Sequence, residues 1–250
     1  HGVDLDVQHG QGGGRGGERG TAVGGSGDWG PPSPRSQNGG AVFVEDCGRA
    51  TIFQNVFMGN LAKKAGGALW QTKCSGDVSE NTFRNNAGQN AGSVWQNACR
   101  KVTVADNRFV NNTADKGSAG VEMNQCNADI GYNRFSYGKS EKGAALYLQG
   151  VVGDVHHCVF ENNAAAFGGA VFRGSSTGNI MDSTFTGNKA RSFGGGVYDS
   201  HVAGDIAGNK FSGNRAARGA AVFRTESKGA ADDNKGLGDE AALVNDNPAA

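Results

Sequence analysis

The chain has 250 residues, in which 24 Lys and Arg residues balance 24 Asp and Glu residues. This net charge of zero gives no general attraction to nucleic acid, and no apolar run approaches the roughly 18–20 residues of a transmembrane helix. Glycine supplies 43 residues, yet aromatic and β-branched residues are retained, so frequent turns are predicted rather than disorder. Because the first residue is His1 rather than Met, we expect that a leader was removed or that the sequence was excised from a longer precursor.

Three segments follow one another along the chain. Residues 1–38 are rich in Gly, Pro and Ser and cannot bury much apolar surface, so we predict a linker or an N-terminal cap there. Residues 39–228 follow a repeating pattern and are predicted to form one repeat domain. Residues 229–250 are predicted to be a C-terminal cap or tail.

A phenylalanine recurs every 25 or 26 residues through the repeat segment, and a branched aliphatic residue stands five positions before each one. The phenylalanines are Phe57, Phe83, Phe109, Phe135, Phe160, Phe185 and Phe211. The aliphatic residues are Ile52, Val78, Val104, Ile130, Val155, Ile180 and Ile206. Asn stands two positions before the Phe in five repeats and three positions after it in six. This regularity predicts a solenoid in which each repeat is one coil.

The repeat lacks a 3.6-residue apolar period, and its Asn-x-Phe alternation and Val/Ile content are typical of short strands. We therefore predict an all-β fold, a right-handed parallel β-helix of about 7–8 coils with roughly 25 residues per coil. The Phe and aliphatic columns are expected to form its core. The Asn two before each Phe is expected to bond to neighbouring coils, and the Asn three after it to adopt the left-handed turn conformation.

Four cysteines occupy one column in consecutive coils, five residues after the aliphatic residue that begins each coil: Cys47, Cys74, Cys99 and Cys126. Disulfides joining 47 to 74 and 99 to 126 are one interpretation, since neighbouring coils bring the Cα atoms within bridging range. Small buried thiols are an equally good interpretation. Four sulfurs on a line exclude a single tetrahedral zinc, and we predict no metal or other cofactor.

Acidic residues stand six positions before the Phe in four coils: Asp77, Asp129, Asp154 and Asp205. Asn and Thr replace them in the other coils, which favours a role in capping turns. The alternative is a calcium site formed by stacked Asp129 and Asp154.

A third polar column stands three positions before the Phe and contains Glu80, Asp106, Tyr132, His157 and Asp182. Arg108 and Arg134 are two residues further on, so alternation should place all of them on one outer face. Polysaccharide lyases and uronate epimerases on β-helices use a face of this kind for proton transfer. Short, equal turns leave no walls for a cleft, however, so we assign no catalytic residue and favour a protein that is not an enzyme.

An aromatic column follows the first aliphatic residue of each coil. Its aromatic members are Phe43, Trp70, Trp95, Tyr147, Phe172, Tyr198 and Phe223. Glu122 occupies the same column, and because burial of an unpaired carboxylate is costly, we expect the column to point outward. An outward row of rings could stack on sugars or bind a partner protein.

The Gly-Gly-Ala triplets at 66–68 and 168–170, together with the Phe-x-x-Asn motif, resemble the repeats of the chlamydial polymorphic outer-membrane proteins. The resemblance covers about residues 39–223 and implies an autotransporter-like adhesin with a β-helical passenger. We therefore expect a secreted or cell-surface structural and adhesive module with an extended lateral binding face. The expected partners are other surface or matrix proteins or a polysaccharide, in a larger assembly or precursor. The alternative is a lyase or epimerase acting on an acidic polysaccharide.

Overall fold

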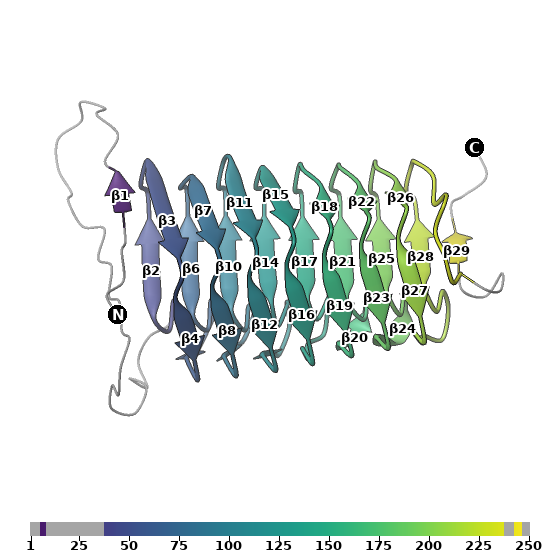
Figure 1. The fold of residues 1–250 in the computed structure, drawn as a ribbon, viewed down its shortest axis with the longest axis horizontal. Helices are drawn as coiled ribbons and strands as arrows, with labels where there is room; N and C mark the ends of the chain where they lie inside the picture. Colours follow the sequence, from purple (N-terminus) through teal and green to yellow (C-terminus); the bar gives the residue numbers. More distant parts are fainter. Residues whose placement is uncertain (1–5, 9–37, 238–242, 247–250) are drawn as a thin grey trace.

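The computed structural model describes residues 6–8, 38–237 and 243–246. All regular structure in these residues is β, and the strands stack coil upon coil along one axis (Figure 1). The predicted all-β parallel β-helix is confirmed. The described residues contain no helix that is long and apolar enough to cross a membrane.

Three long sheets form the sides of the solenoid. The nine-stranded sheet consists of β2 (Val42–Glu45), β6 (Leu69–Thr72), β10 (Val94–Asn97), β14 (Val121–Asn124), β17 (Leu146–Gln149), β21 (Val171–Gly174), β25 (Val197–Ser200), β28 (Val222–Thr225) and β29 (Leu243–Asp246). The eight-stranded sheet consists of β1 (Asp6–Gln8), β3 (Arg49–Phe53), β7 (Gly76–Ser79), β11 (Val102–Ala105), β15 (Ala128–Gly131), β18 (Val155–His156), β22 (Ile180–Met181) and β26 (Ile206–Ala207). The seven-stranded sheet consists of β4 (Val56–Met58), β8 (Thr82–Arg84), β12 (Arg108–Val110), β16 (Arg134–Ser136), β19 (Val159–Glu161), β23 (Thr184–Thr186) and β27 (Lys210–Ser212).

Two small sheets complete the coils beside the seven-stranded sheet. One consists of β5 (Leu61–Ala62), β9 (Ala87–Gly88) and β13 (Thr113–Ala114), and the other of β20 (Ala164–Phe167) and β24 (Lys189–Phe193). Neighbouring coils pair in parallel and in register, as Phe109 with Phe135 illustrates. Two pairings depart from this pattern: β1 pairs antiparallel with β3 at the N-terminal end of the solenoid, and β20 pairs with β24 with a register shift.

Stacked phenylalanine rings run through the core. The seven phenylalanines are 0% to 7% exposed, and successive ring centroids lie 4.6 to 5.3 Å apart with interplanar angles of 4° to 16°. The branched aliphatic column beside them is equally buried. Both core columns predicted from the repeat are therefore confirmed.

Both Asn columns are hydrogen-bonded ladders between coils. Asn81 donates its backbone N–H and its side-chain Nδ2 to Asn107 Oδ1, at 2.9 and 3.1 Å. Asn86, three residues after Phe83, is also buried and donates its backbone N–H to Asn112 Oδ1 at 2.8 Å. The second column was expected to adopt the left-handed turn conformation, and that prediction was wrong.

The left-handed residue lies one position earlier, two after each Phe. Asn occupies it in three coils, Gly in three others and Tyr in one: Asn85 (φ 55°), Asn111 (φ 53°), Asn162 (φ 53°), Gly59, Gly187, Gly213 and Tyr137 (φ 58°). The chain turns outward there, so a polar side chain or none at all suits the position. The Asn that follows points inward, where its amide satisfies backbone groups of the adjacent coils.

The core of the last coils contains buried charges. Arg173 donates two hydrogen bonds to the Asp199 carboxylate, at 2.8 and 2.7 Å, and Arg224 Nε lies 3.5 Å from the same carboxylate. All three side chains are at most 2% exposed. They belong to an inward-facing column whose side chains are apolar or glutamine in the earlier coils. In those coils, Gln96 Nε2 donates a hydrogen bond to Gln71 Oε1.

The predicted limits of the three segments, 1–38, 39–228 and 229–250, stay predictions. Most of residues 1–38 lies outside the described residues. Within the described range 38–237, Asn38 already bridges to Ala65, and pairing continues past residue 228, since Lys235 bridges to Lys210 and β29 pairs with β28.

Candidate binding face

The aromatic column lies on the outer side of the nine-stranded sheet. Burial alternates along these strands, so the aliphatic residue points inward and the neighbouring aromatic residue points outward. Phe43 is 36% exposed and most of the other rings are partly exposed. Phe223 is 3% exposed, although it occupies the same column, because Phe193 and Arg218 pack against its ring.

The rings form two stacks separated by Glu122. In the first stack, Trp70 and Trp95 lie face to face with centroids 3.6 Å apart, and Phe43 stacks on Trp70 at 5.9 Å. In the second stack, Tyr147, Phe172, Tyr198 and Phe223 follow one another at 5.2, 4.8 and 5.5 Å. The first two rings of the second stack meet edge to face.

The second stack contains two rings that the sequence repeat does not predict. Phe167 and Phe193, at the ends of β20 and β24, lie 6.2 and 6.1 Å from the Tyr198 ring. Their strands pair with a register shift, so these rings belong to no regular column and were missed. Two cations accompany the rings: Lys142 Nζ lies 5.5 Å from the Tyr147 centroid, and Arg218 lies 5.1 Å from the Phe223 centroid.

Glu122 is 6% exposed, and burial raises the pKa of its carboxyl above the ordinary value. Asn124 donates to its Oε1 at 3.3 Å, and this bond and the nearby Lys142 charge offset part of the effect on the pKa. A Cβ at Gly117 would collide with the carboxylate, so glycine provides the space that Glu122 occupies. The aromatic column points outward, as expected from the sequence. Glu122 is nevertheless buried within this column, which the argument from the cost of burying a carboxylate did not predict.

A polar column runs parallel to the rings, two residues further along each strand and on the same side of the sheet. Its members are Glu45, Thr72, Asn97, Asn124, Gln149, Gly174, Ser200, Thr225 and Asp246. The carboxylates of Glu45 and Asp246 are exposed at its two ends, and all other members except Thr72 and Gly174 are partly exposed. Amide and hydroxyl groups thus stand beside the aromatic column at the spacing of the coils.

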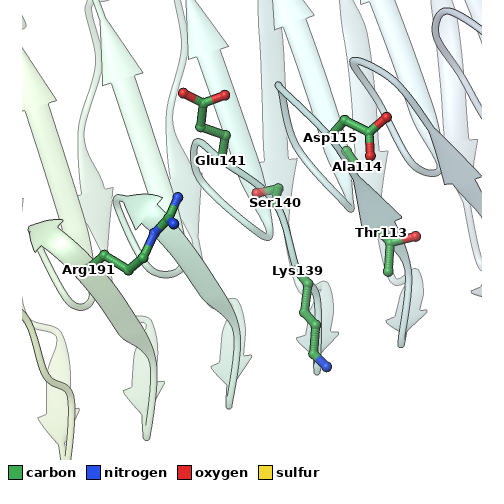
Figure 2. Close-up of a pocket in the computed structure, with 7 residues that line it drawn as sticks. All are labelled: Thr113, Ala114, Asp115, Lys139, Ser140, Glu141 and Arg191. Carbon is green, nitrogen blue, oxygen red and sulfur yellow. The ribbon is translucent and has the colours of Figure 1, made fainter.

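A notch of about 360 Å³ opens near the second stack, on the side formed by the small sheets. Its lining residues are Thr113, Ala114, Asp115, Lys139, Ser140, Glu141 and Arg191 (Figure 2). The intervening coil has only alanines at 164–166, which are too small to fill the space between its neighbours. Its charged residues are of both signs, with Asp115 and Glu141 acidic and Lys139 and Arg191 basic. Figure 2 shows these side chains spread apart along several coils.

Two comparisons with known families bear on this arrangement. Residues 35–180 match the right-handed β-helix region family. The chain belongs to that family. Residues 182–200 match the Chlamydia polymorphic membrane protein repeat, which confirms the resemblance carried by the Gly-Gly-Ala and Phe-x-x-Asn motifs. No curated protein and no solved structure matches this chain. The two family matches indicate a β-helical protein of the surface type.

The polar column with Tyr132 and His157 lies at a different edge of the β-helix. Its members occupy left-handed turn positions and are exposed, as predicted for an outer face, with φ of 58° at Tyr132 and 51° at His157. The Tyr132 and His157 rings stack at 4.9 Å. Arg134 pairs with Glu161 at 2.6 Å rather than facing the His157 ring. The notch described above is on another side, and this column lines none of it.

The five cysteines of the β-helix are free thiols, so neither candidate disulfide is present. The column is nonetheless closely stacked, because the backbone N–H of Cys47 donates to Cys74 Sγ at 3.3 Å and that of Cys99 to Cys126 Sγ at 3.4 Å. Stacked Cβ atoms follow the roughly 4.8 Å strand spacing, which exceeds the roughly 3.5–4.5 Å of a disulfide. The interpretation as small buried thiols therefore fits this β-helix better.

The thiols influence one another's ionisation. Hydrogen bonding from Cys126 is the main cause that lowers the pKa of Cys99 to about 7, and the same pairing raises the pKa of Cys126. Burial raises the pKa of Cys158 to about 12.

The acidic column caps turns between coils. Asp154 Oδ1 accepts the backbone N–H of Asn179 at 2.7 Å, and Asp205 Oδ1 accepts that of Ala230 at 2.8 Å. Asp129 instead contacts His156, with Oδ1 3.0 Å from Nε2. The alternative of a calcium site at Asp129 and Asp154 gains no support, because each carboxylate already has a local partner. Among the described residues, no group of three or more His, Cys, Asp or Glu is placed to hold a metal ion.

Proposed function

We propose that the protein is an extracellular surface module that binds polysaccharide along the outer side of its nine-stranded sheet. The observation that carries the proposal is the face-to-face Trp70 and Trp95 pair beside a column of amide and hydroxyl side chains. The family matches support a surface-type β-helix, and the binding face extends that conclusion to a ligand class.

Rings and amides recognise different parts of a sugar. The C–H face of a pyranose stacks on a flat ring, which buries area at little entropic cost, while amide and hydroxyl groups bond to sugar hydroxyls. Asn97 is partly exposed on the strand that carries Trp95, which places both types of group within reach of one ligand.

The arrangement favours a polymer over a small molecule. The same two columns recur from coil to coil at about 4.8 Å, so the face offers many similar contacts along the axis. Lys142 and Arg218 lie over the rings of the second stack and could pair with acidic groups on the polymer.

A polysaccharide lyase or uronate epimerase is a second candidate. The stack of Tyr132 on His157, and the contact of His156 with Asp129, bring proton-transfer groups together. Tyr132 and His157 are exposed on turns, however, and none of these groups lines the notch beside the small sheets, which makes binding without turnover the better-supported function.

A double variant tests the proposed face. Trp70→Ala/Trp95→Ala removes two rings worth about 1 kcal/mol each, so affinity for the polysaccharide that binds best on a glycan array should fall about 30-fold. Phe53→Ala is the matched control, because Phe53 is an exposed aromatic residue on the eight-stranded sheet. It should leave affinity unchanged.

Thermal unfolding and a parallel enzyme assay complete this experiment. The melting temperature of the double variant should stay close to that of the wild type. Equal affinity of the double variant and the wild type would overturn the proposed face. The parallel assay measures release of unsaturated uronate from an acidic polysaccharide. If the wild type released it and Tyr132→Phe did not, the enzymatic alternative would replace the proposed binding function.

A further inference from the structure

Two histidine rings face one another at the edge of the eight-stranded sheet. His156 ends β18 and His157 follows it at the turn, and their Nδ1 atoms lie 3.1 Å apart. On its other side, His156 Nε2 lies 3.0 Å from Asp129 Oδ1 in the preceding coil. This polar cluster takes no part in the aromatic face described above.

The position of the carboxylate selects the tautomers of the two neutral rings. Asp129 is an acceptor, so His156 carries its proton on Nε2 and presents the lone pair of Nδ1 toward His157. His157 Nδ1 then donates into that lone pair. When a cation binds between the rings, the proton of His157 moves from Nδ1 to Nε2 of the same ring, so both Nδ1 atoms become ligands and Asp129 remains bonded to the far side of His156. A carboxylate behind a histidine ligand is the usual outer-shell partner of a protein metal site.

The spacing of the two nitrogens suits one metal ion. With metal–nitrogen bonds of about 2.0–2.1 Å, nitrogens at this separation subtend an angle of about 95–100° at the metal. That angle lies between the octahedral and tetrahedral values, so both rings can bind without moving apart.

The neighbouring coil is shaped to hold the rings. A Cβ at position 131 would collide with the His156 ring, so Gly131 lets the imidazole lie flat across the preceding coil. The Tyr132 ring stacks on His157 at 4.9 Å and meets His156 edge to face at 5.4 Å. The pair is therefore held from one side, while His157 is open to solvent on the other.

We propose that His156 and His157 bind one divalent transition-metal ion through their Nδ1 atoms, with Asp129 orienting His156. Imidazole nitrogens suit Cu²⁺, Ni²⁺ and Zn²⁺ and do not suit Ca²⁺ or Mg²⁺. Two protein ligands leave the remaining coordination positions to water or to an external group, so the ion is exchangeable. The order of affinity should follow Cu²⁺ above Ni²⁺ and Zn²⁺.

Calorimetric titration of the full chain with Cu²⁺, Zn²⁺ and Ca²⁺ tests the site. The chain has five histidines, and His1→Gln/His9→Gln removes the two outside the described residues, which leaves His156, His157 and His201. In this background we expect one equivalent of Cu²⁺ or Zn²⁺ to bind and no Ca²⁺ at the same concentrations. His157→Asn should abolish that binding, because Asn tolerates the left-handed backbone but removes the ligand.

Two further variants distinguish the metal ligands from the carboxylate that orients them and from an unrelated histidine. Asp129→Asn should weaken Cu²⁺ and Zn²⁺ binding about 10- to 100-fold by removing the outer-shell carboxylate. His201→Asn is the matched control, since His201 is also exposed at a left-handed turn, and it should change nothing. Unchanged binding in His157→Asn, or equal loss in His201→Asn, would overturn the site. Near-ultraviolet circular dichroism should show the native fold in every variant.

Discussion

Glu122 is the residue at which the aromatic column departs from its own pattern. Burial raises the pKa of its carboxyl, so the folded protein holds this proton to a higher pH than the unfolded chain does. Between the unfolded value of 4.5 and the raised folded value, the folded state binds more protons. The stability contributed by this residue is therefore lost as pH rises through that window.

Glu122→Gln directly tests the predicted loss of stability with rising pH. Glutamine keeps the shape and carries no charge, so the variant should melt at a higher temperature than the wild type at neutral pH. The difference should shrink as pH is lowered toward 4.5, where Glu122 is protonated in the fold. Melting curves across this range provide the measurement. A wild type that gains stability over the variant as pH rises would contradict the assignment.

The cysteine column makes a second prediction at the scale of single residues. Cys74, Cys99, Cys126 and Cys158 are buried, whereas Cys47 is partly exposed. A thiol reagent should therefore modify one cysteine readily in the native protein and all five after unfolding without reductant. Fewer than five reactive thiols in denaturant would show that a disulfide forms.

At the scale of the coil, the phenylalanine column is the principal packing element. Phe109 is buried between Phe83 and Phe135, so Phe109→Ala leaves a cavity and should lower the free energy of unfolding by about 3–5 kcal/mol. Phe53→Ala, at an exposed aromatic residue, should cost under about 1 kcal/mol in the same urea titration. Equal losses would mean that the ring stack is not the main source of stability.

The buried ionic cluster of Arg173, Asp199 and Arg224 stabilises the later coils only while all three charges are present. Asp199→Asn keeps the side-chain shape but leaves Arg173 and Arg224 without their carboxylate, which should cost about 3–5 kcal/mol. Asp182→Asn, at an exposed turn, is the matched control and should be nearly neutral. Urea unfolding measures both, and similar values for the two variants would contradict a structural role for the cluster.

Periodicity explains which elements could be predicted. The Phe column and its aliphatic neighbour recur without exception, so their burial followed from the repeat alone. The two Asn columns look alike in sequence, and only the structure shows that the left-handed residue is Asn85 or its equivalent rather than the next one. That shift by one position reverses which side chain points inward.

Features confined to one or two coils could not be predicted in this way. Phe193 joins the second ring stack through a register shift, and Arg173 meets Asp199 because a charge replaces an apolar residue in two adjacent coils. The contact between His156 and Asp129 joins residues 27 positions apart, in two columns that the repeat treats separately. A repeat pattern predicts columns, whereas these contacts depend on departures from the columns.

At the scale of the whole molecule, the solenoid presents similar side chains at regular intervals along its axis (Figure 1). A face of this type gains contacts with each added unit of an extended ligand, whereas an enclosed pocket is filled by one or two units. Rigid stacking of the coils places the binding groups before the ligand arrives, so little ordering cost opposes binding.

Affinity as a function of oligosaccharide length is the measurement that tests the proposed face most directly. Oligomers of two to eight units, prepared from the polysaccharide that binds best, would be titrated into the wild-type protein by calorimetry. We expect affinity to rise with each added unit over several units, and this rise to flatten in Trp70→Ala/Trp95→Ala. A disaccharide that binds as tightly as the longest oligomer, or a length series that is identical in the double variant, would contradict an extended aromatic binding face.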